Sequence, residues 1–244
     1  MRNNSCGTYE ELAREYYDTS RHPTCANFRQ ASAILFRKWN SSLASGLYWS
    51  CEIGAGKSLL AEFMSLEEFR SARLLLIDSS PAMLEHSKAF SVPGQTPIIG
   101  AATALPLKQD STDFVASFLG DPYNVSKFWR EVFRVLQPGG QFVFTAPSYE
   151  WASAFREGLA PEMQSTAEFV LADGRRVFVP SFVLPEEKQL ELIKSSNFRI
   201  LDIASVRVSD LSEDGLSPKL MVKRSKKLVV ASGYLCGKPH EAAK

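Results

Sequence analysis

The chain has 244 residues, of which 45% are hydrophobic and 23% charged. This apolar fraction is too high for a disordered chain, and the length suits one domain, or a domain and a half, with a sizeable core. No apolar run approaches the roughly 20 residues that a membrane helix needs. The stretch from Met1 to Glu10 is polar, so no targeting peptide is visible. We therefore expect a cytoplasmic protein without a membrane partner.

Charge and cysteine usage exclude further classes. There are 28 Lys and Arg residues against 27 Asp and Glu, a net charge of +1, but residues 217–244 hold seven basic residues and one acidic residue. Without a chain-wide positive field, the composition argues against a nucleic-acid partner. The four cysteines form no C-x-x-C pair and have no His at zinc-like spacing, so we expect reduced thiols and no metal.

The first 46 residues are predicted to be helical. Apolar side chains recur at three-to-four spacing in two stretches, Tyr9 to Tyr17 and Ala31 to Trp39. His22-Pro23 interrupts between them, because the residue before a proline is disfavoured in helical geometry. We therefore expect an N-terminal helical cap over residues 1–46.

From Leu47 onward, short apolar runs alternate with helical stretches. The expected strands are Leu47–Ile53, Leu74–Ile77, Ile98–Ile99, Phe114–Phe118 and Gln141–Thr145. Helices are expected to begin near Leu59 and Pro81, and over Val125 to Leu136, where Pro138-Gly139-Gly140 follows. This alternation predicts a mostly parallel sheet that is covered by helices on both faces.

The C-terminal part has a different pattern. Residues 147–184 have weak periodicity and are too long for a plain connection, so we expect a substrate-lid insertion there. A helix is expected over Pro185–Ser195, followed by strands over Phe198–Val208 and Lys227–Leu235. Two strands without a helix between them predict an antiparallel hairpin. The expected fold is an α/β, three-layer αβα sandwich around a seven-stranded sheet, with residues 47–244 as one domain beside the cap.

The turn from Glu52 to Ser58 is the most informative stretch, because it follows a strand and precedes a helix. Glycines there allow a ligand close to the backbone, and the helix N-terminus offers free N–H groups. A dinucleotide-binding turn would need its third glycine at Leu59, and a Walker A loop would need its first at Cys51. Asp78, at the end of the next strand, is suited to accept ribose hydroxyls or to cap the helix that follows.

Four segments resemble, in the same order, the motifs of class I S-adenosylmethionine-dependent methyltransferases of the type-11-like set. They are Glu52-Ile53-Gly54-Ala55-Gly56, Leu76-Ile77-Asp78, Ala101-Ala102-Thr103-Ala104-Leu105-Pro106 and Arg134-Val135-Leu136-Gln137-Pro138-Gly139-Gly140. The resemblance covers roughly Leu47 to Ala146. It implies a Rossmann-like fold, S-adenosylmethionine as methyl donor, S-adenosylhomocysteine as product, and no metal.

The resemblance also implies a cofactor site at the strand ends. Gly54, Ala55 and Gly56 would lie under the methionine part, Glu52 would hold the turn and reach the ammonium, and Asp78 would bind the ribose. The other implied residues are Ser79 and Met83 at the adenine pocket, Ala102 and Thr103 at the adenine edge, and Phe118, Leu119 and Gly120 beside the methyl group.

Two positions depart from the family pattern. Ser58 replaces the third glycine, which is tolerable because helix N-termini accept serine. Ala101 stands where the adenine-binding segment usually has an acid, so we expect weaker cofactor binding.

Methyl transfer from a sulfonium is a direct displacement, so alignment and exclusion of water matter most. A base is needed only when the acceptor must lose a proton. His22, Tyr17 and Asp121 are candidate catalytic residues by position. The alternatives are a surface turn for His22, core packing or a lid over the cofactor for Tyr17, and a helix cap for Asp121. His86 and His240 are expected to lie away from the site.

The acceptor is expected to be chosen by residues 1–46 and 147–184. Their aromatic side chains favour a small-molecule methyl acceptor with an O, N or C nucleophile. An RNA or protein acceptor is the alternative, suggested by five basic residues between Lys219 and Lys227, although protection of a sheet edge is the stronger interpretation of these lysines. A non-catalytic partner protein that binds the cofactor is a further alternative, and the oligomeric state has no sequence signal.

Overall fold

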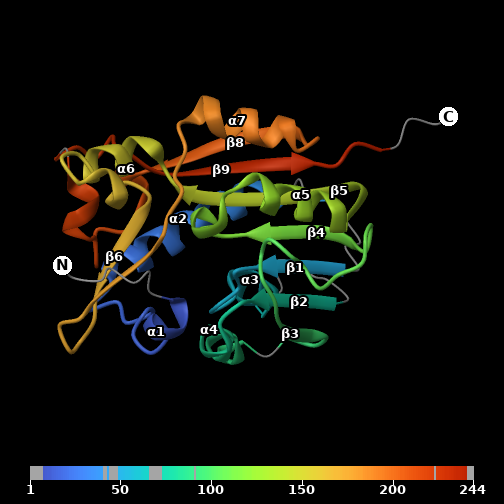
Figure 1. The fold of residues 1–244 in the computed structure, drawn as a ribbon, viewed down its shortest axis with the longest axis horizontal. Helices are drawn as coiled ribbons and strands as arrows, with labels where there is room; N and C mark the ends of the chain where they lie inside the picture. Colours follow the sequence, from blue (N-terminus) through green and yellow to red (C-terminus); the bar gives the residue numbers. More distant parts are fainter. Residues whose placement is uncertain are drawn as a thin grey trace.

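A seven-stranded sheet in the order β3-β2-β1-β4-β5-β9-β8 forms the centre of the computed structural model (Figure 1). The structure describes residues 8–40, 43, 49–65, 73–90, 92–222 and 224–240. The strands of this sheet are β1 (Trp49–Ile53), β2 (Arg73–Asp78), β3 (Gln95–Ile99), β4 (Thr112–Ser117), β5 (Leu136–Pro147), β8 (Arg199–Arg207) and β9 (Val229–Gly237). All neighbouring pairs are parallel except those of β9, which is antiparallel to both β5 and β8. The predicted mostly parallel sheet with a C-terminal hairpin is confirmed.

The register of the central strands positions the turns that follow them. Ile53 at the end of β1 pairs with Ile77 of β2, and Gly54 N donates to Ile77 O at 2.8 Å. The glycine turn and Asp78 therefore lie side by side. The strand order reverses at β1, which has β2 on one side and β4 on the other. In sheets of this kind, ligands bind beyond the carboxyl ends of the strands at the point of reversal.

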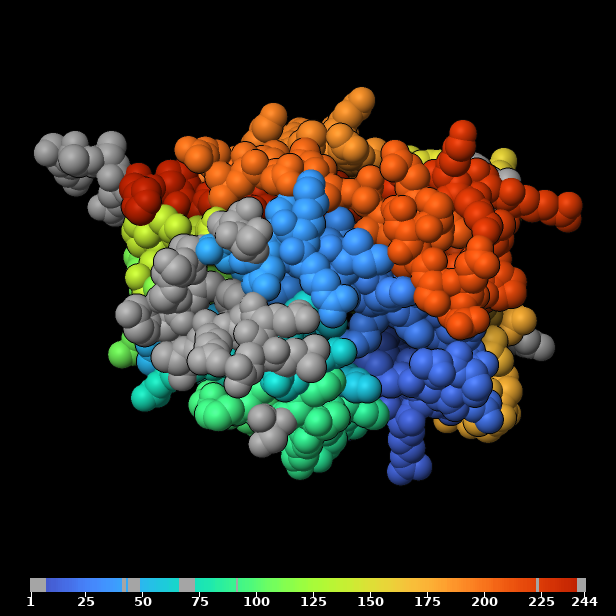
Figure 2. Space-filling view, turned by 180° about the vertical axis from the view of Figure 1, so that it is seen from behind, coloured from blue at the N-terminus to red at the C-terminus, as the bar shows by residue number. Residues whose placement is uncertain are grey.

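Helices cover both faces of the sheet, as its apolar runs predict. On one face lie α2 (Pro23–Asn40) and α3 (Leu59–Ser65), and on the other α5 (Ser126–Val135) and α7 (Glu186–Ser195). Figure 2, seen from behind Figure 1, has α2 in blue across the middle of its face. Two further helices, α4 (Pro81–Glu85) and α6 (Tyr149–Phe155), begin at the serine caps Ser80 and Ser148.

The N-terminal segment differs from its predicted helix. Among described residues 8–22 the helix is α1 (Tyr9–Leu12), turns follow it, and α2 begins at Pro23, so the second predicted helical stretch is confirmed. The first predicted stretch is wrong beyond Leu12, because Tyr16 and Tyr17 turn toward a cavity instead of continuing one helical face. A helix of four residues has little stability of its own, so its packing must hold it.

The Pro-Gly-Gly turn is also built differently from the prediction. α5 ends at Val135 and β5 begins at once, since Leu136 already pairs with Thr112. The next pair is Phe114 with Gln141, so the intervening residues of β5 form a bulge. Gly139 has a φ of +82° there and donates its N–H to Lys238 O at 2.9 Å.

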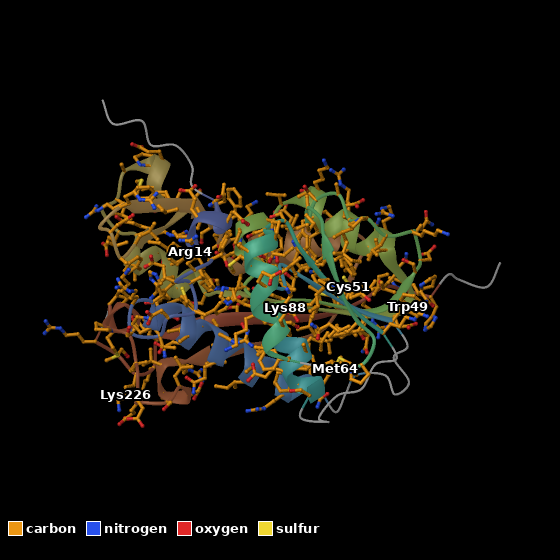
Figure 3. The ribbon with its side chains drawn as sticks, turned by 90° about the horizontal axis from the view of Figure 1, so that it is seen from below. Arg14, Trp49, Cys51, Met64, Lys88 and Lys226 are labelled. Carbon is orange, nitrogen blue, oxygen red and sulfur yellow. The ribbon has the colours of Figure 1, made fainter. Side chains whose placement is uncertain are left out.

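The insertion 147–184 contains a second, two-stranded antiparallel sheet. Its strands are β6 (Thr166–Val170) and β7 (Arg176–Pro180), and α6 precedes them. Phe169 and Val179 of this hairpin pack against Leu12. In Figure 3 the labelled Arg14 lies on the opposite side of the strands from Trp49, which begins β1, so the N-terminal segment lies on the side of the carboxyl ends of the parallel strands.

Short 3₁₀ helices complete the chain: η1 (His86–Ala89), η2 (Asp121–Tyr123), η3 (Pro161–Met163), η4 (Val208–Asp210) and η5 (Pro218–Met221). No helix within the described ranges is both long and apolar enough to cross a bilayer. Cys25, Cys51 and Cys236 are free thiols, while Cys6 lies outside the described residues. The described part of the chain holds no group of three or more His, Cys, Asp or Glu residues suited to a metal ion.

Candidate functional site

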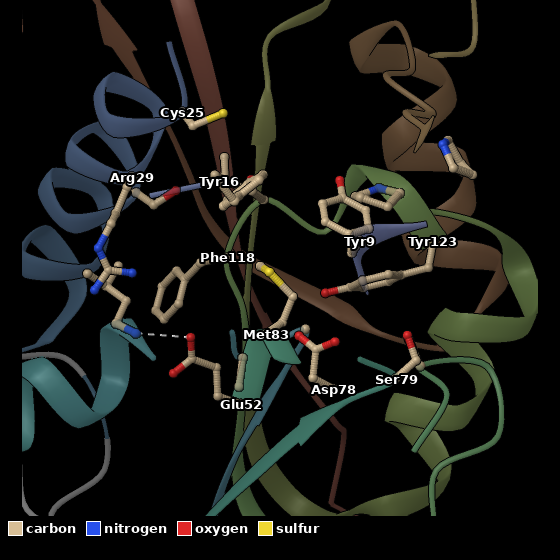
Figure 4. A pocket seen from close by; sticks show the side chains of 18 of the residues that line it. Tyr9, Tyr16, Cys25, Arg29, Glu52, Asp78, Ser79, Met83, Phe118 and Tyr123 are labelled. Carbon is tan, nitrogen blue, oxygen red and sulfur yellow. Dashed lines mark hydrogen bonds between the residues drawn. The ribbon is translucent and has the colours of Figure 1, made fainter. Parts of the chain in front are cut away.

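A cavity of about 330 Å³ lies beyond the carboxyl ends of β1, β2 and β4. This volume falls in the range of small-molecule sites. Its wall contains ten of the residues that the sequence proposed for the cofactor: Glu52, Gly54, Ala55, Asp78, Ser79, Met83, Ala102, Thr103, Phe118 and Leu119. Gly56 and Gly120 stand behind this wall, packed against Tyr17 and Phe144 respectively. We call this space the first cavity (Figure 4).

Glu52 fixes the start of α3. Its carboxylate accepts N–H bonds from Leu59 (3.1 Å) and Leu60 (2.9 Å) and the hydroxyl of Ser58. The Ser58 hydroxyl in turn accepts the Ala61 N–H at 2.8 Å, so this serine caps the helix in place of a glycine. Glu52 is 2% exposed, and burial raises the pKa of its carboxyl group against these hydrogen bonds. The side chain thus holds the turn, as expected.

Asp78 presents a partly satisfied carboxylate to the first cavity. One oxygen accepts Gly56 N–H at 3.1 Å and the other accepts Ser80 N–H at 3.0 Å, so each keeps capacity for a further donor. Burial raises the pKa of Asp78, and the backbone donors oppose the rise. Asp78 therefore braces the helix start, and its oxygens keep acceptor capacity on the side of the first cavity.

Two tyrosine hydroxyls lie over the glycine turn. A Cβ at Gly54, where φ is +67°, would lie 2.1 Å from Tyr123 Oη, and one at Gly56 would lie 2.3 Å from Tyr17 Oη. Tyr123 Oη donates to Ile53 O at 2.8 Å, and Tyr17 Oη accepts Lys57 N–H at 2.7 Å. Only glycine fits at both positions, because of the conformation as well as the space.

The segment from Ala101 to Pro106 is held in place by Arg134. Arg134 donates to Leu107 O at 2.8 Å and pairs with Glu131, whose carboxylate accepts Leu105 N–H at 2.8 Å. α5 thereby fixes the segment that carries Ala102 and Thr103. Ala101 adds no polar side chain, and the hydroxyl-bearing residues of this part of the wall are Ser79 and Thr103.

A second cavity of about 380 Å³ adjoins the first. The two share four lining residues, Tyr9, Tyr16, Cys25 and Leu119. Aromatic side chains from three elements form most of the apolar wall of the second cavity: Phe28 from α2, Trp151 and Phe155 from α6, and Phe169 from β6. Its polar residues include His22, Asp121, Arg156, Ser181 and Lys219.

Residues 51–144 match the family model described as a methyltransferase domain. This match identifies a methyltransferase domain within the chain. No curated protein sequence matches the chain.

Solved structures share the methyltransferase fold at low sequence identity. A proposed S-adenosylmethionine-dependent methyltransferase from Listeria monocytogenes has 13% identity and a TM-score of 0.62, covering 84% of this chain and 98% of that one. A proposed methyltransferase from Haloferax volcanii, in complex with the Trm112 methyltransferase activator, has 16% identity and a TM-score of 0.64, covering 97% and 96%. The [4+2]-cyclase SpnF has 14% identity and a TM-score of 0.62, covering 96% and 97%.

The three candidate catalytic residues fall in different places. His22 and Asp121 line the second cavity, and Tyr17 lines the first. His86 does not stand apart as expected: its ring packs against Tyr17 at 4.8 Å between centroids, and its Nε2 lies 2.6 Å from Ala13 O. His240 lies against Gly139, near the opposite strand ends.

Asp121 belongs to a buried polar network. It is 7% exposed, and its carboxylate accepts the Ser181 hydroxyl at 2.5 Å. Ser181 Oγ accepts from Arg156 Nη2 at 2.7 Å, and Arg156 also donates to Gln164 O at 2.7 Å. Burial raises the pKa of Asp121 to about 6, although Ser181 and Arg156 favour the charged form. The network joins the loop after β4 to the insertion.

The raised pKa of Asp121 should make the free energy of unfolding depend on pH. The folded state holds the Asp121 proton to a higher pH than the unfolded state does, so the wild-type free energy of unfolding falls as pH rises from about 4 through 6. We expect Asp121→Asn to gain about 1–3 kcal/mol relative to wild type between pH 4 and pH 7.5. Urea unfolding at several pH values measures the difference. A difference that stays constant with pH would contradict the assignment.

Several cavity residues had only weak sequence signals. Arg29 lines the first cavity and donates to Lys57 O at 2.5 Å, with Glu62 as its ion-pair partner. Tyr123 could have been found from its position alone, because it lies two residues after Asp121 in the segment that follows β4. The helical periodicity around Tyr9 predicts only that one face of the helix is buried, whereas Tyr9 lines both cavities.

Two of the described basic C-terminal residues are already engaged. Lys219 lines the second cavity, and Lys226 pairs with Glu213. Lys223 lies outside the described residues. The strand that follows these residues, β9, lies between β5 and β8, so the edge strand of this hairpin is β8.

Proposed function

We propose that this methyltransferase domain transfers the methyl group of S-adenosylmethionine to a small, largely apolar molecule. The observation that carries the proposal is the shared wall of the two cavities. A donor in the first cavity and an acceptor in the second would meet beside Leu119, at the end of the loop from β4. Such a meeting point is what a direct displacement requires.

The residues of the first cavity fit the proposed cofactor. Asp78 has acceptor capacity for ribose hydroxyls, and Gly54 and Ala55 expose backbone for the methionine part. Arg29 is the cationic residue of this wall and would meet the methionine carboxylate. Ser79, Met83, Ala102 and Thr103 would enclose the adenine, while Phe118 and Leu119 would lie beside the methyl group. Gly56 and Gly120 would act through the backbone they shape.

The bound cofactor supplies an electrophilic methyl group on a positively charged sulfur. The protein's part is to orient the acceptor and exclude water. The hairpin β6–β7 and the segment from Tyr9 to His22 cover the cavities, and Phe169, Leu12 and Val179 seal this cover with apolar contacts. When water is excluded from the place where the two cavities meet, it cannot compete with the acceptor for the methyl group, and it cannot screen the charges that align the acceptor.

The second cavity favours a small acceptor over a macromolecule. Its wall comes largely from the N-terminal segment and the insertion, and aromatic rings are prominent in it. The cavity volume of about 380 Å³ suits a drug-sized molecule. Lys226 is neutralised by Glu213, and this weakens the basic stretch as an RNA contact.

Transfer of a radiolabelled methyl group to a cell-extract fraction tests the proposal. We expect S-adenosylmethionine to bind and the label to appear in small molecules that partition into organic solvent. Label in acid-precipitated RNA or protein would replace the small acceptor by a macromolecular one. Binding without transfer to any fraction would favour a non-catalytic partner, and absence of binding would overturn the cofactor assignment.

A variant of the acceptor wall tests the assignment of the second cavity. Phe155 lines it and stacks on Trp151 with ring centroids 5.1 Å apart. We expect Phe155→Ala to raise KM for the acceptor several-fold and leave the S-adenosylmethionine Kd unchanged. Tyr149→Ala is the control, since Tyr149 is an exposed aromatic residue on the same helix outside this wall.

A further inference from the structure

One residue in the wall of the second cavity has a buried ring nitrogen without a hydrogen-bond partner in the described part of the chain. His22 lines this cavity, yet its Nε2 is buried without a hydrogen-bond partner among the described residues. The side chain is 8% exposed, and its ring packs edge-on against Phe169 with centroids 5.5 Å apart. Buried polar atoms normally find partners, so an orphan atom in a ligand-sized cavity calls for an explanation.

Glu15 is the acidic residue that faces this nitrogen. Its Oε2 lies 4.0 Å from His22 Nε2, too far for a hydrogen bond in this arrangement but close enough for a strong charge interaction. A carboxylate on this side favours the tautomer with the proton on Nε2 and stabilises the imidazolium. With the proton on Nε2, Nδ1 keeps its lone pair.

Burial and the charges around His22 act in opposite directions on its pKa. Burial is the largest effect and lowers the pKa of His22, while Glu15 and Asp18 raise it. Arg21 on the same segment and Lys219 from η5 lower it. On β6, Glu168 pairs with Arg176 at 3.0 Å, which neutralises the acidic group on that side. A neutral imidazole near pH 7 is able to accept a proton.

The covering hairpin fixes the position of Glu15. Both carboxylate oxygens accept the N–H of Ala172, at 2.9 and 3.2 Å, in the turn between β6 and β7. Leu171 in the same turn packs with Leu12. The element that closes the second cavity therefore also places the carboxylate opposite His22.

We propose that His22 is the general base for a phenolic or enolic hydroxyl acceptor, and that Glu15 is its positioning residue. The inference rests on the proposed methyl transfer. The acceptor oxygen forms a bond to the methyl carbon, the sulfur–methyl bond breaks with its electron pair left on sulfur, and the hydroxyl proton passes to Nδ1. The aromatic walls at Phe28 and Trp151 suit a flat ring, and its hydroxyl is acidic enough to yield its proton to an imidazole as the bond forms.

Two phenols of different acidity test the base. At pH 8, 4-methylphenol is neutral and 4-nitrophenol is largely ionised. We expect wild type to methylate both, and His22→Gln to lower kcat for 4-methylphenol by about 10²–10⁴ while affecting the ionised phenol at most about tenfold. Equal loss on both phenols would overturn the role of His22. If wild type binds S-adenosylmethionine but methylates neither phenol, the acceptor class is wrong while the cofactor assignment stands.

The pH profile tests Glu15. Activity on 4-methylphenol should rise with pH through the pKa of His22, and this limb should vanish in His22→Gln. Because Glu15 raises that pKa, Glu15→Gln should move the limb to lower pH and reduce kcat, with the S-adenosylmethionine Kd unchanged. Glu11→Gln makes the same charge change on the same segment, beside Arg175, and should leave the limb in place. A limb that moves only in Asp121→Asn would transfer the base role to Asp121 and refute the proposal.

Discussion

Asp78→Ala is expected to weaken S-adenosylmethionine binding by about 1–3 kcal/mol, or roughly 5- to 150-fold in Kd. The carboxylate has one backbone donor on each oxygen and acceptor capacity left toward the first cavity. Its removal would leave two ribose hydroxyls without partners in a partly buried site. Calorimetric titration with S-adenosylmethionine and with S-adenosylhomocysteine should give the same loss, since both carry the ribose.

A matched carboxylate separates binding from folding. Glu10 accepts the Ser80 hydroxyl and Ala82 N–H at the start of the same helix, but it does not line the first cavity. Glu10→Ala should therefore disturb α4 as Asp78→Ala does, without a comparable change in Kd. If both variants lose affinity equally, Asp78 acts through the helix start and not through the ribose.

Phe36→Ala is expected to lower the free energy of unfolding by about 3–5 kcal/mol. Phe36 is fully buried on α2 and packs against Phe63, Phe114 and Phe118, with ring centroids 4.7, 6.2 and 5.5 Å away. Truncation leaves a cavity between α2 and the centre of the sheet. A close-packed core relaxes too little to fill this cavity. Urea unfolding followed by fluorescence and circular dichroism measures the loss.

The same experiment distinguishes a core helix from a separate cap. Because α2 packs on the sheet, it should unfold with it in one transition for both probes. The control Lys38→Ala, on the same helix, removes an exposed ion pair with Asp202 and should cost less than about 1 kcal/mol. Two separate transitions, or a Phe36→Ala effect as small as that of Lys38→Ala, would mean that α2 folds independently.

The sheet and the glycine turn were predictable because their signals are local. Continuous apolar runs such as Leu74–Ile77 indicate a strand covered on both faces, and the observed burial of β2 agrees. The turn after β1 needs glycine for conformational reasons that are readable from a few residues, and Gly54 indeed has a positive φ. Motif order then places Asp78 beside that turn, since parallel neighbours end at the same sheet edge.

Elements with the same periodicity could not be told apart. The apolar stripe of α2 says that one face is buried but not against what, and packing on the sheet decided it. The stripe from Tyr9 to Tyr17 looked equally helical, yet contacts with the hairpin β6–β7 turned its aromatic side chains into the cavities. Such contacts join segments more than 150 residues apart, which no local pattern encodes.

By itself the sequence determined the strand–helix alternation, the turn and the acid that would face a ribose, because each depends on backbone conformation or burial within a short stretch. Tertiary structure alone decided the covering hairpin, the two adjoining cavities, and the meeting of Glu15 with His22 and Ala172. The physical reason is that these features depend on where distant segments pack, and a charge or ring acquires its role only from the groups that packing brings against it.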